Sequence, residues 1–144
     1  ALVPYPVPCS TALESALGKT PREVLASKHY LCVFDNENQV ADLQPDFVAL
    51  ANLDLPAVIV TAQGSNEFDF VSRFFAPANG VAEDPVSGVA HCCLTPFWSE
   101  RLDSLKMKAK QLSTRGGVIH CELGRDRVRL AGSALIFLEG QIAI

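Results

Sequence analysis

The sequence predicts an α+β fold: a curved, mixed β-sheet wrapped round one central, buried helix. Apolar, β-branched runs of strand length recur along the chain, with capping signals for short helices between them. The stretch from Gly88 to Phe97 is small and apolar on almost every side, which is typical of a buried helix. With 144 residues, 49% of them hydrophobic, the chain can also build a sizeable core.

Residues 1–28 are predicted to be an inter-lobe linker with two short helices. Thr11 with Glu14 forms a capping-box pattern, and Gly18 is placed to end that helix. The pair Thr20-Pro21 repeats the start signal for a second helix. The chain begins without Met and with a Pro-rich run, so we expect it to be part of a larger protein.

Residues 29–144 are predicted to form one lobe. Pro45-Asp46 starts a short helix through Ala51, and the three residues at 124–126 form a hairpin turn. The buried helix beginning after Gly88 follows a long loop. The apolar runs predict strands at 30–34, 57–62, 68–76, 105–112, 118–123, 127–131 and 134–144.

Charge and cysteine content narrow the class of protein. The net charge of −4 offers no broad basic face, so no nucleic-acid or anionic-lipid partner is expected. No apolar run approaches the ~20 residues that a membrane-spanning helix needs, so no membrane contact is expected. The five cysteines are an odd number without a CxxC pair, which favours a reducing, cytoplasmic location.

The start of the buried helix is the candidate site. The first amides of a helix lack partners within it and carry the positive end of its dipole. The turn Ser87-Gly88-Val89-Ala90 could therefore bind a substrate carboxylate or phosphate. Asp84, just before it, would be a general acid or base. His91 could reach the same pocket, or satisfy a backbone group in the core. The same loop residues are also typical of an ordinary helix cap. Their chemistry alone leaves both interpretations open, a substrate-binding site or a structural cap.

Other reactive side chains favour structural roles. Adjacent residues on a helix or strand point in different directions, so His91-Cys92-Cys93 and His120-Cys121 do not predict a metal site. Cys92 and Cys93 are expected to pack as small hydrophobic groups rather than react. The Arg115-Gly116-Gly117 segment could contact an anion or simply form a turn. The alternating arginines at 125, 127 and 129 favour a solvated strand face.

An ordered series of motifs resembles the phenazine-biosynthesis-like (PhzF-like) family over nearly the whole chain. In chain order the motifs are Leu43-Gln44-Pro45-Asp46-Phe47, Gly64 through Phe70, Ser72-Arg73-Phe74-Phe75-Ala76-Pro77, Glu83-Asp84-Pro85-Val86-Ser87-Gly88, Ala90-His91-Cys92, Pro96-Phe97-Trp98, Gln111-Leu112-Ser113, Arg115-Gly116-Gly117 and Asp126-Arg127-Val128. The resemblance implies a diaminopimelate-epimerase-like fold with two similar lobes and the active site between them. It also implies proton transfer at carbon without metal or organic cofactor, as in isomerisation of a dihydroanthranilate-type substrate.

The resemblance assigns the chain to the C-terminal lobe, residues 29–144, plus the connecting linker. Asp84 matches the family's second-lobe aspartate and Gly88 its helix-start glycine, whereas the principal acid/base glutamate belongs to the other lobe. Val89 stands where the family commonly has Ser, so a contact through that hydroxyl is lost.

These observations predict the C-terminal half of a cofactor-independent isomerase or epimerase acting on a small carboxylate-bearing molecule. We expect the half to be inactive without its N-terminal lobe, unless a second copy in a homodimer replaces that lobe. The alternative is a non-catalytic small-anion-binding or protein-interaction module built on the same fold.

Overall fold

The computed structural model describes residues 3–142 and confirms the α+β class. The helices are α1 (Thr11–Leu17), α2 (Glu37–Ala41), α3 (Phe47–Ala51), α4 (Gly88–Leu102) and the 3₁₀ turn η1 (Pro77–Asn79). The strands are β1 (Tyr5–Pro6), β2 (Glu23–Ala26), β3 (Tyr30–Val33), β4 (Val58–Gln63), β5 (Phe70–Ala76), β6 (Val81–Glu83), β7 (Lys106–Gln111), β8 (Gly117–Leu123) and β9 (Val128–Ala131).

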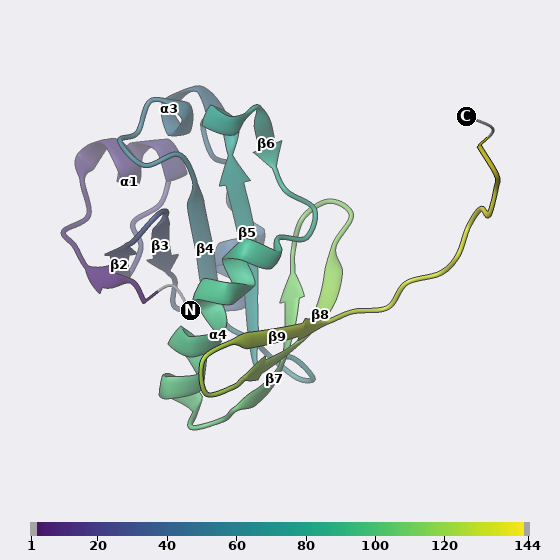
Figure 1. Cartoon of the computed structure of the whole chain (residues 1–144). Coiled ribbons are helices and arrows are strands. Elements are labelled where there is room, and N and C mark those ends of the chain that lie inside the picture. The colour runs from purple at the N-terminus through teal and green to yellow at the C-terminus, as the bar shows by residue number, and fades with distance from the viewer. Residues whose placement is uncertain (1–2, 143–144) are drawn as a thin grey trace.

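The strands form one mixed sheet in the order β1-β2-β3-β4-β5-β7-β8-β9, with β6 also paired to β5. The β3–β4 and β5–β7 pairs are parallel, and the others are antiparallel. Figure 1 shows the sheet bending so that β7, β8 and β9 come round beneath α4. The predicted curved mixed sheet with a central helix is therefore confirmed.

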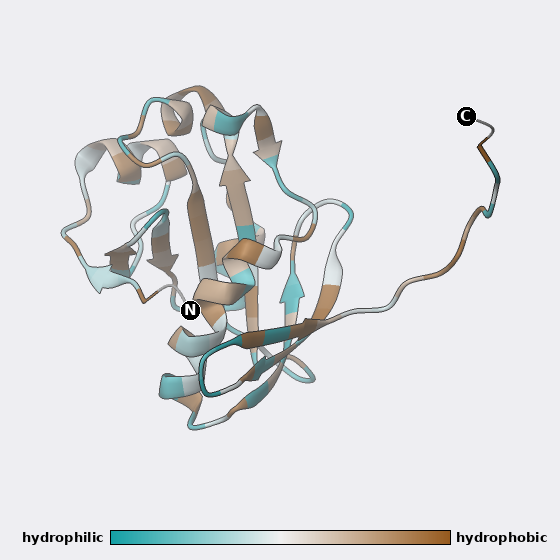
Figure 2. Ribbon diagram, viewed as in Figure 1, coloured by the Kyte–Doolittle hydropathy of each residue, from teal (hydrophilic) through white to brown (hydrophobic). Residues whose placement is uncertain are grey.

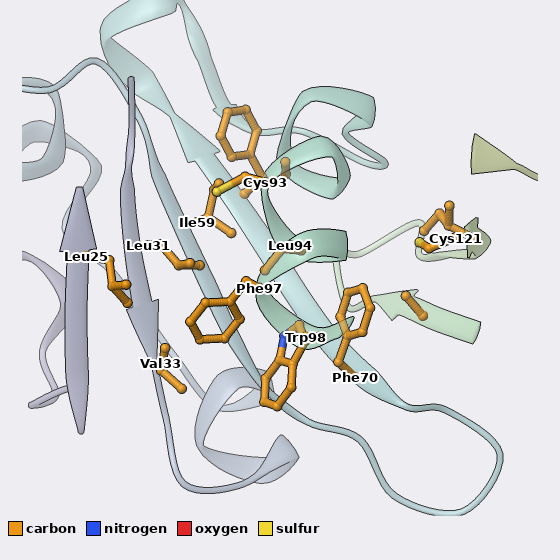
Figure 3. Packing of buried hydrophobic residues seen from close by; sticks show 14 of the residues in the cluster. Leu25, Leu31, Val33, Ile59, Phe70, Cys93, Leu94, Phe97, Trp98 and Cys121 are labelled. Atoms are coloured by element: carbon orange, nitrogen blue, oxygen red, sulfur yellow. The ribbon is translucent and has the colours of Figure 1, made fainter. Parts of the chain in front are cut away.

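Both faces of the central strands are covered, which explains their continuous apolar runs. In β4, Val58 and Val60 pack with the cluster formed with α1, α2 and α3, whereas Ile59 belongs to the cluster beneath α4. Figure 2 shows the ribbon of β4 as apolar along most of its length. In Figure 3, Phe97 and Trp98 project from α4 toward the strands of the sheet.

Helix α4 is buried mainly on its sheet side. Its residues packed toward the strands, including Leu94 and Trp98, are at most 6% exposed. The first turn is open instead: Val89 is 44% exposed, and Glu100 is exposed further along the helix. The helix ends at Asp103, which adopts the left-handed conformation with φ of 49°. The strands among residues 3–142 thus leave the start of α4 accessible.

Several predicted elements near the N-terminus need correction. The helix predicted after Thr20-Pro21 is wrong, because residues 23–26 form strand β2, whose buried side chains pair in register with β3. The cap of α1 is Ser10 rather than Thr11: the Ser10 Oγ accepts a hydrogen bond from the Leu13 amide at 3.1 Å. Residues 5–26 thus contribute two strands to the main sheet, and the boundary at residue 28 stays a prediction.

The strand predicted for residues 134–144 is absent from the described part of the chain. Residues 132–142 have no regular secondary structure, and residues 143–144 lie outside the described residues. Helix α2 and strand β6 were not predicted. None of the helices within residues 3–142 combines the length and the apolar character that crossing a bilayer requires.

Candidate functional site at the start of helix α4

The loop that carries Asp84 is fixed to the sheet by a buried glutamine. Gln111, at the end of β7, is fully buried. Its Oε1 accepts a hydrogen bond from the Ser87 amide at 2.9 Å, and its Nε2 donates to the Asp84 carbonyl at 2.6 Å. The Asp84 amide in turn donates to the Phe74 carbonyl at 2.9 Å. Both ends of the Asp84–Ser87 loop are therefore held through the loop's own backbone atoms, and the Asp84 carboxylate takes no part in these contacts.

A second contact holds the middle of this loop. The Ser113 hydroxyl donates to the Pro85 carbonyl at 2.6 Å and accepts from the Gly116 amide at 3.0 Å. The turn between β7 and β8 therefore packs directly against the Asp84 loop. Gly116 lies in this turn with φ of +67°, a conformation that favours glycine.

The helix start presents free backbone donors. The Ser87 Oγ accepts from the Ala90 amide at 3.2 Å, and the Ser87 carbonyl accepts from the His91 amide at 3.3 Å. For the amides of Gly88 and Val89, residues 3–142 provide no acceptor. Because the dipole of this 15-residue helix adds partial positive charge, these two amides are a favourable position for an anion.

A cavity of about 750 Å³ opens at this helix start. It is lined by Ser87, Gly88 and His91, by the turn at residues 115–117, and by residues 130–133 after β9. The structure thus brings three of the predicted binding residues together with Arg115, whose guanidinium adds a positive charge.

The other predicted site residues lie beside this cavity. Asp84 is half-buried in the loop before it and does not belong to its lining. Val89 is exposed at the helix start, whereas Ala90 is fully buried beneath it. The roles of Asp84, Val89 and Ala90 in binding or catalysis stay predictions.

His91 combines the two roles considered from the sequence. It is fully buried, its Nδ1 lies 2.7 Å from the Ser87 carbonyl, and it lines the cavity. Burial lowers the pKa of His91, so the ring is neutral near pH 7. Because a carbonyl can only accept, the proton lies on Nδ1 and leaves Nε2 as an acceptor. This Nε2 is buried without a hydrogen-bond partner among the described residues.

Two of the cysteines beneath α4 are not activated. Burial raises the pKa of Cys93 to about 11 and also raises that of Cys121, so both thiols stay protonated near pH 7. Both belong to the core beneath α4, consistent with packing, whereas Cys92 is only half-buried and lies outside that core, so its expected packing role stays a prediction. Within residues 3–142, no group of three or more histidine, cysteine or acidic side chains could hold a metal ion.

The sequence analysis did not identify the two residues whose side chains hold the Asp84 loop. Gln111 and Ser113 belong to the motif that carried the resemblance, but no role was inferred for them. A signal was present: Gln111 continues the buried face of β7 set by Met107 and Ala109. A buried amide at such a position needs hydrogen-bond partners, which the Asp84 loop supplies.

Substituting Gly117 with Ala should displace the Asp84 loop. A Cβ at this position would lie 2.4 Å from the Cγ2 of Val86, and a β-branched side chain has little freedom to move away. We expect a loss of about 1–3 kcal/mol in the free energy of unfolding, measured by urea denaturation.

The double variant Gly117→Ala, Val86→Ala should recover part of that loss, because it removes the clashing methyl group. Gly132→Ala serves as the control, since a Cβ there would meet nothing closer than 3.7 Å. Equal stability of Gly117→Ala and Gly132→Ala would contradict the proposed close contact.

Comparison with known proteins places the whole chain in one group. The family model described as phenazine biosynthesis-like protein (PhzC-PhzF) matches residues 9–140. A Pseudomonas aeruginosa protein described as an uncharacterized isomerase is 48% identical over 145 residues, covering 100% of this chain and 55% of that protein. A Halalkalibacterium halodurans protein with the same description is 44% identical over 116 residues, covering 80% of this chain and 44% of that protein.

Solved structures agree with this grouping. A PhzF family phenazine biosynthesis protein of Enterococcus faecalis superposes with a TM-score of 0.92 at 40% identity, covering 99% of this chain and 55% of that chain. These neighbours share the diaminopimelate-epimerase-like fold, which confirms the fold that the motifs implied. The chain spans about half the length of these relatives. It belongs to the phenazine biosynthesis-like (PhzF) protein family.

Proposed function

We propose that this chain is the C-terminal half of a cofactor-independent isomerase that moves a proton between carbons of a small carboxylate-bearing molecule. The observation that carries the proposal is the start of α4: among residues 3–142 the amides of Gly88 and Val89 have no acceptor, and Gly88 lines a cavity that Arg115 also lines. The descriptions of two relatives as isomerases support the reaction class. Their greater length supports a second half of the active site.

In this proposal the substrate carboxylate lies against the amides of Gly88 and Val89. Backbone donors there can hold an anion close to the chain, because Gly88 has no side chain to obstruct it. The Nε2 of His91, which has no hydrogen-bond partner among residues 3–142, could accept a hydrogen bond from a hydroxyl or amine of the substrate.

The chemistry would need groups from both halves. A base in the companion half removes a proton from one carbon, the C–H electron pair shifts into the adjacent π-system, and a proton returns at another carbon. Asp84 would assist this transfer or orient the base.

Replacing Gly88 with Ala should weaken anion binding without harming the fold. A Cβ at Gly88 has no neighbour closer than 4.0 Å, so the helix tolerates it. The added methyl group would nevertheless stand at the helix start, where a ligand must approach. In the complete native polypeptide, we expect the affinity for benzoate to fall by about tenfold or more and the thermal midpoint to stay unchanged.

The measurement is an NMR titration that follows the amides of residues 88–90, with neutral benzamide as the matched control ligand. Benzoate, but not benzamide, should shift these amides in the unmodified protein. Identical responses to both ligands would remove the case for an anion site.

A second function is favoured by one feature. Val89, which is 44% exposed at the helix start, provides no hydroxyl there. The lack of a hydroxyl suits a binding module that performs no chemistry. Such a module would bind benzoate as above yet catalyse no proton exchange on any small acid. The proposal also includes the partner that completes the site, which is either the N-terminal lobe or a second copy of this chain in a homodimer, and a cytoplasmic location.

A further inference from the structure

The cavity at the start of α4 has two separate groups of donors for an anion. One is the helix start itself, where the amides of Gly88 and Val89 have no acceptor among residues 3–142. The other is the turn at residues 115–117, which lines the same cavity and carries the guanidinium of Arg115. Each group has enough N–H donors to bind a carboxylate by itself.

The charge of Arg115 is not neutralised by an acidic neighbour. Its side chain is exposed, and none of the salt bridges within residues 3–142 includes it. Glu83 shares a smaller hollow of about 290 Å³ with Arg115, but its carboxylate is bound by Arg73 at 2.7 and 3.0 Å. The guanidinium of Arg115 is therefore available to a ligand.

The backbone that carries Arg115 is held in place on both sides. Before it, the Ser113 hydroxyl donates to the Pro85 carbonyl at 2.6 Å. After it, Gly117 packs so closely on Val86 that a Cβ at residue 117 would lie 2.4 Å from the Val86 Cγ2. The turn thus fixes where the arginine starts, while the exposed side chain stays free to adjust to a ligand.

Apolar side chains lie between the two groups of donors. Val86, Ile119 and Leu130 also line the cavity. Val86 packs against Gly117 in the turn and directly precedes Ser87, the residue that caps α4. The cavity volume of about 750 Å³ is ample for a small molecule. A cavity of this kind suits a hydrocarbon framework that carries two separate acidic groups.

We propose that this cavity binds a small, unsaturated dicarboxylate and that Arg115 determines this specificity. One carboxylate lies against the amides of Gly88 and Val89. The second takes two parallel hydrogen bonds from the guanidinium, a geometry that arginine favours with carboxylates. The inference rests on the anion site of the proposed function, and it adds the second acidic group and the residue that recognises it.

Titration of the complete native polypeptide with benzoate and with the three benzenedicarboxylates tests the proposal. The three isomers hold their carboxylates at increasing separations. We expect at least one of them to bind about tenfold or more tightly than benzoate, because it gains a second charge-assisted contact. NMR should show that isomer shifting the amides of residues 88–90. Three isomers that bind no better than benzoate, or that leave these amides unshifted, would overturn the proposal.

The monoamide of the preferred dicarboxylate is the matched control ligand. It keeps one carboxylate and the shape of the molecule, but a neutral amide replaces the second charge. We expect the monoamide to bind about as weakly as benzoate. A monoamide as tight as the dicarboxylate would show that shape rather than charge is recognised, which would contradict the role given to Arg115.

Two substitutions test Arg115 directly. Arg115→Gln should abolish the preference for the dicarboxylate over benzoate, whereas Arg125→Gln should keep it. Arg125 is the matched control because it is exposed in the turn between β8 and β9 and does not line the cavity. The comparison of two ligands in one variant cancels any general effect on the fold. Equal losses of affinity for both ligands in Arg115→Gln would mean that both groups of donors hold one carboxylate, and the inference would be wrong.

This inference and the proposed function can fail separately. Benzoate that shifts the amides of residues 88–90 without any preference for a dicarboxylate would remove the inference and leave the anion site. A clear dicarboxylate preference, without exchange of C–H protons on small unsaturated dicarboxylates in D₂O, would leave the inference and remove the isomerase reaction.

Discussion

Changing Glu83 to Gln should lower the free energy of unfolding by about 3–5 kcal/mol. Glu83 accepts two hydrogen bonds from Arg73, at 2.7 and 3.0 Å, and the two side chains are only 16% and 11% exposed. Removing one charge from a buried pair leaves the other charge without compensation. Because β6 and β5 meet at this pair, the loss also loosens the strand that leads into Asp84.

The arginine makes this pair part of a larger network. Its Nη1 donates to the Leu43 carbonyl at 2.8 Å and, at 3.3 Å each, to the carbonyls of Val40 and Ala41 at the end of α2. These carbonyls carry the negative end of the helix dipole. They offset part of the stranded charge in Glu83→Gln, so the effect should lie nearer 3 than 5 kcal/mol.

Urea denaturation of a double-mutant cycle isolates the pair. Glu83→Gln and Arg73→Met should each be strongly destabilising, and the double variant should lose less than the two losses added together. Asp35→Asn is the control, because Arg22 and Asp35 are 3.8 Å apart and more than half exposed, and such pairs contribute about 0–1 kcal/mol. An effect of Glu83→Gln as small as that of Asp35→Asn would show that the buried pair contributes little.

The main features of the fold follow from local patterns in the sequence. The buried strand β4 was recognisable because both of its faces are apolar. Helix α4 was recognisable because the stretch from Gly88 to Phe97 is apolar on almost every side. The β2 segment was misread because a Thr-Pro-x-Glu pattern also fits a helix start. Pairing with β3 over residues 23–26 decided its conformation, and such pairing depends on residues distant from the local pattern.

The candidate site was predictable only in part. A helix start after Ser87-Gly88 can be recognised locally, because capping depends on neighbouring residues. Gln111 contacts the Asp84 loop from 24 and 27 residues away, a relation that no local pattern contains. The C-terminal segment shows the opposite case: its apolar run predicts a strand, but residues 134–142 have no regular secondary structure and no partner strand among the described residues.

Changing Asp84 to Asn in the complete polypeptide should reduce proton transfer by about 100-fold or more while leaving the fold intact. The fold should survive because Asp84 is held through its backbone: its amide contacts Phe74 and its carbonyl contacts Gln111. No hydrogen bond to its carboxylate is found among residues 3–142. An amide of the same shape can keep these backbone contacts, but it cannot take or return a proton at neutral pH.

The measurement is the exchange of substrate C–H protons with deuterium in D₂O, followed by NMR over a panel of small unsaturated acids that includes a dihydroanthranilate-type compound. Asp126→Asn is the matched control, because Asp126 is exposed in the hairpin turn between β8 and β9. Unchanged exchange in Asp84→Asn would remove Asp84 from the chemistry. Absence of exchange in the unmodified protein, together with benzoate binding at residues 88–90, would favour the binding module, because the two functions share the anion site and differ in the proton step.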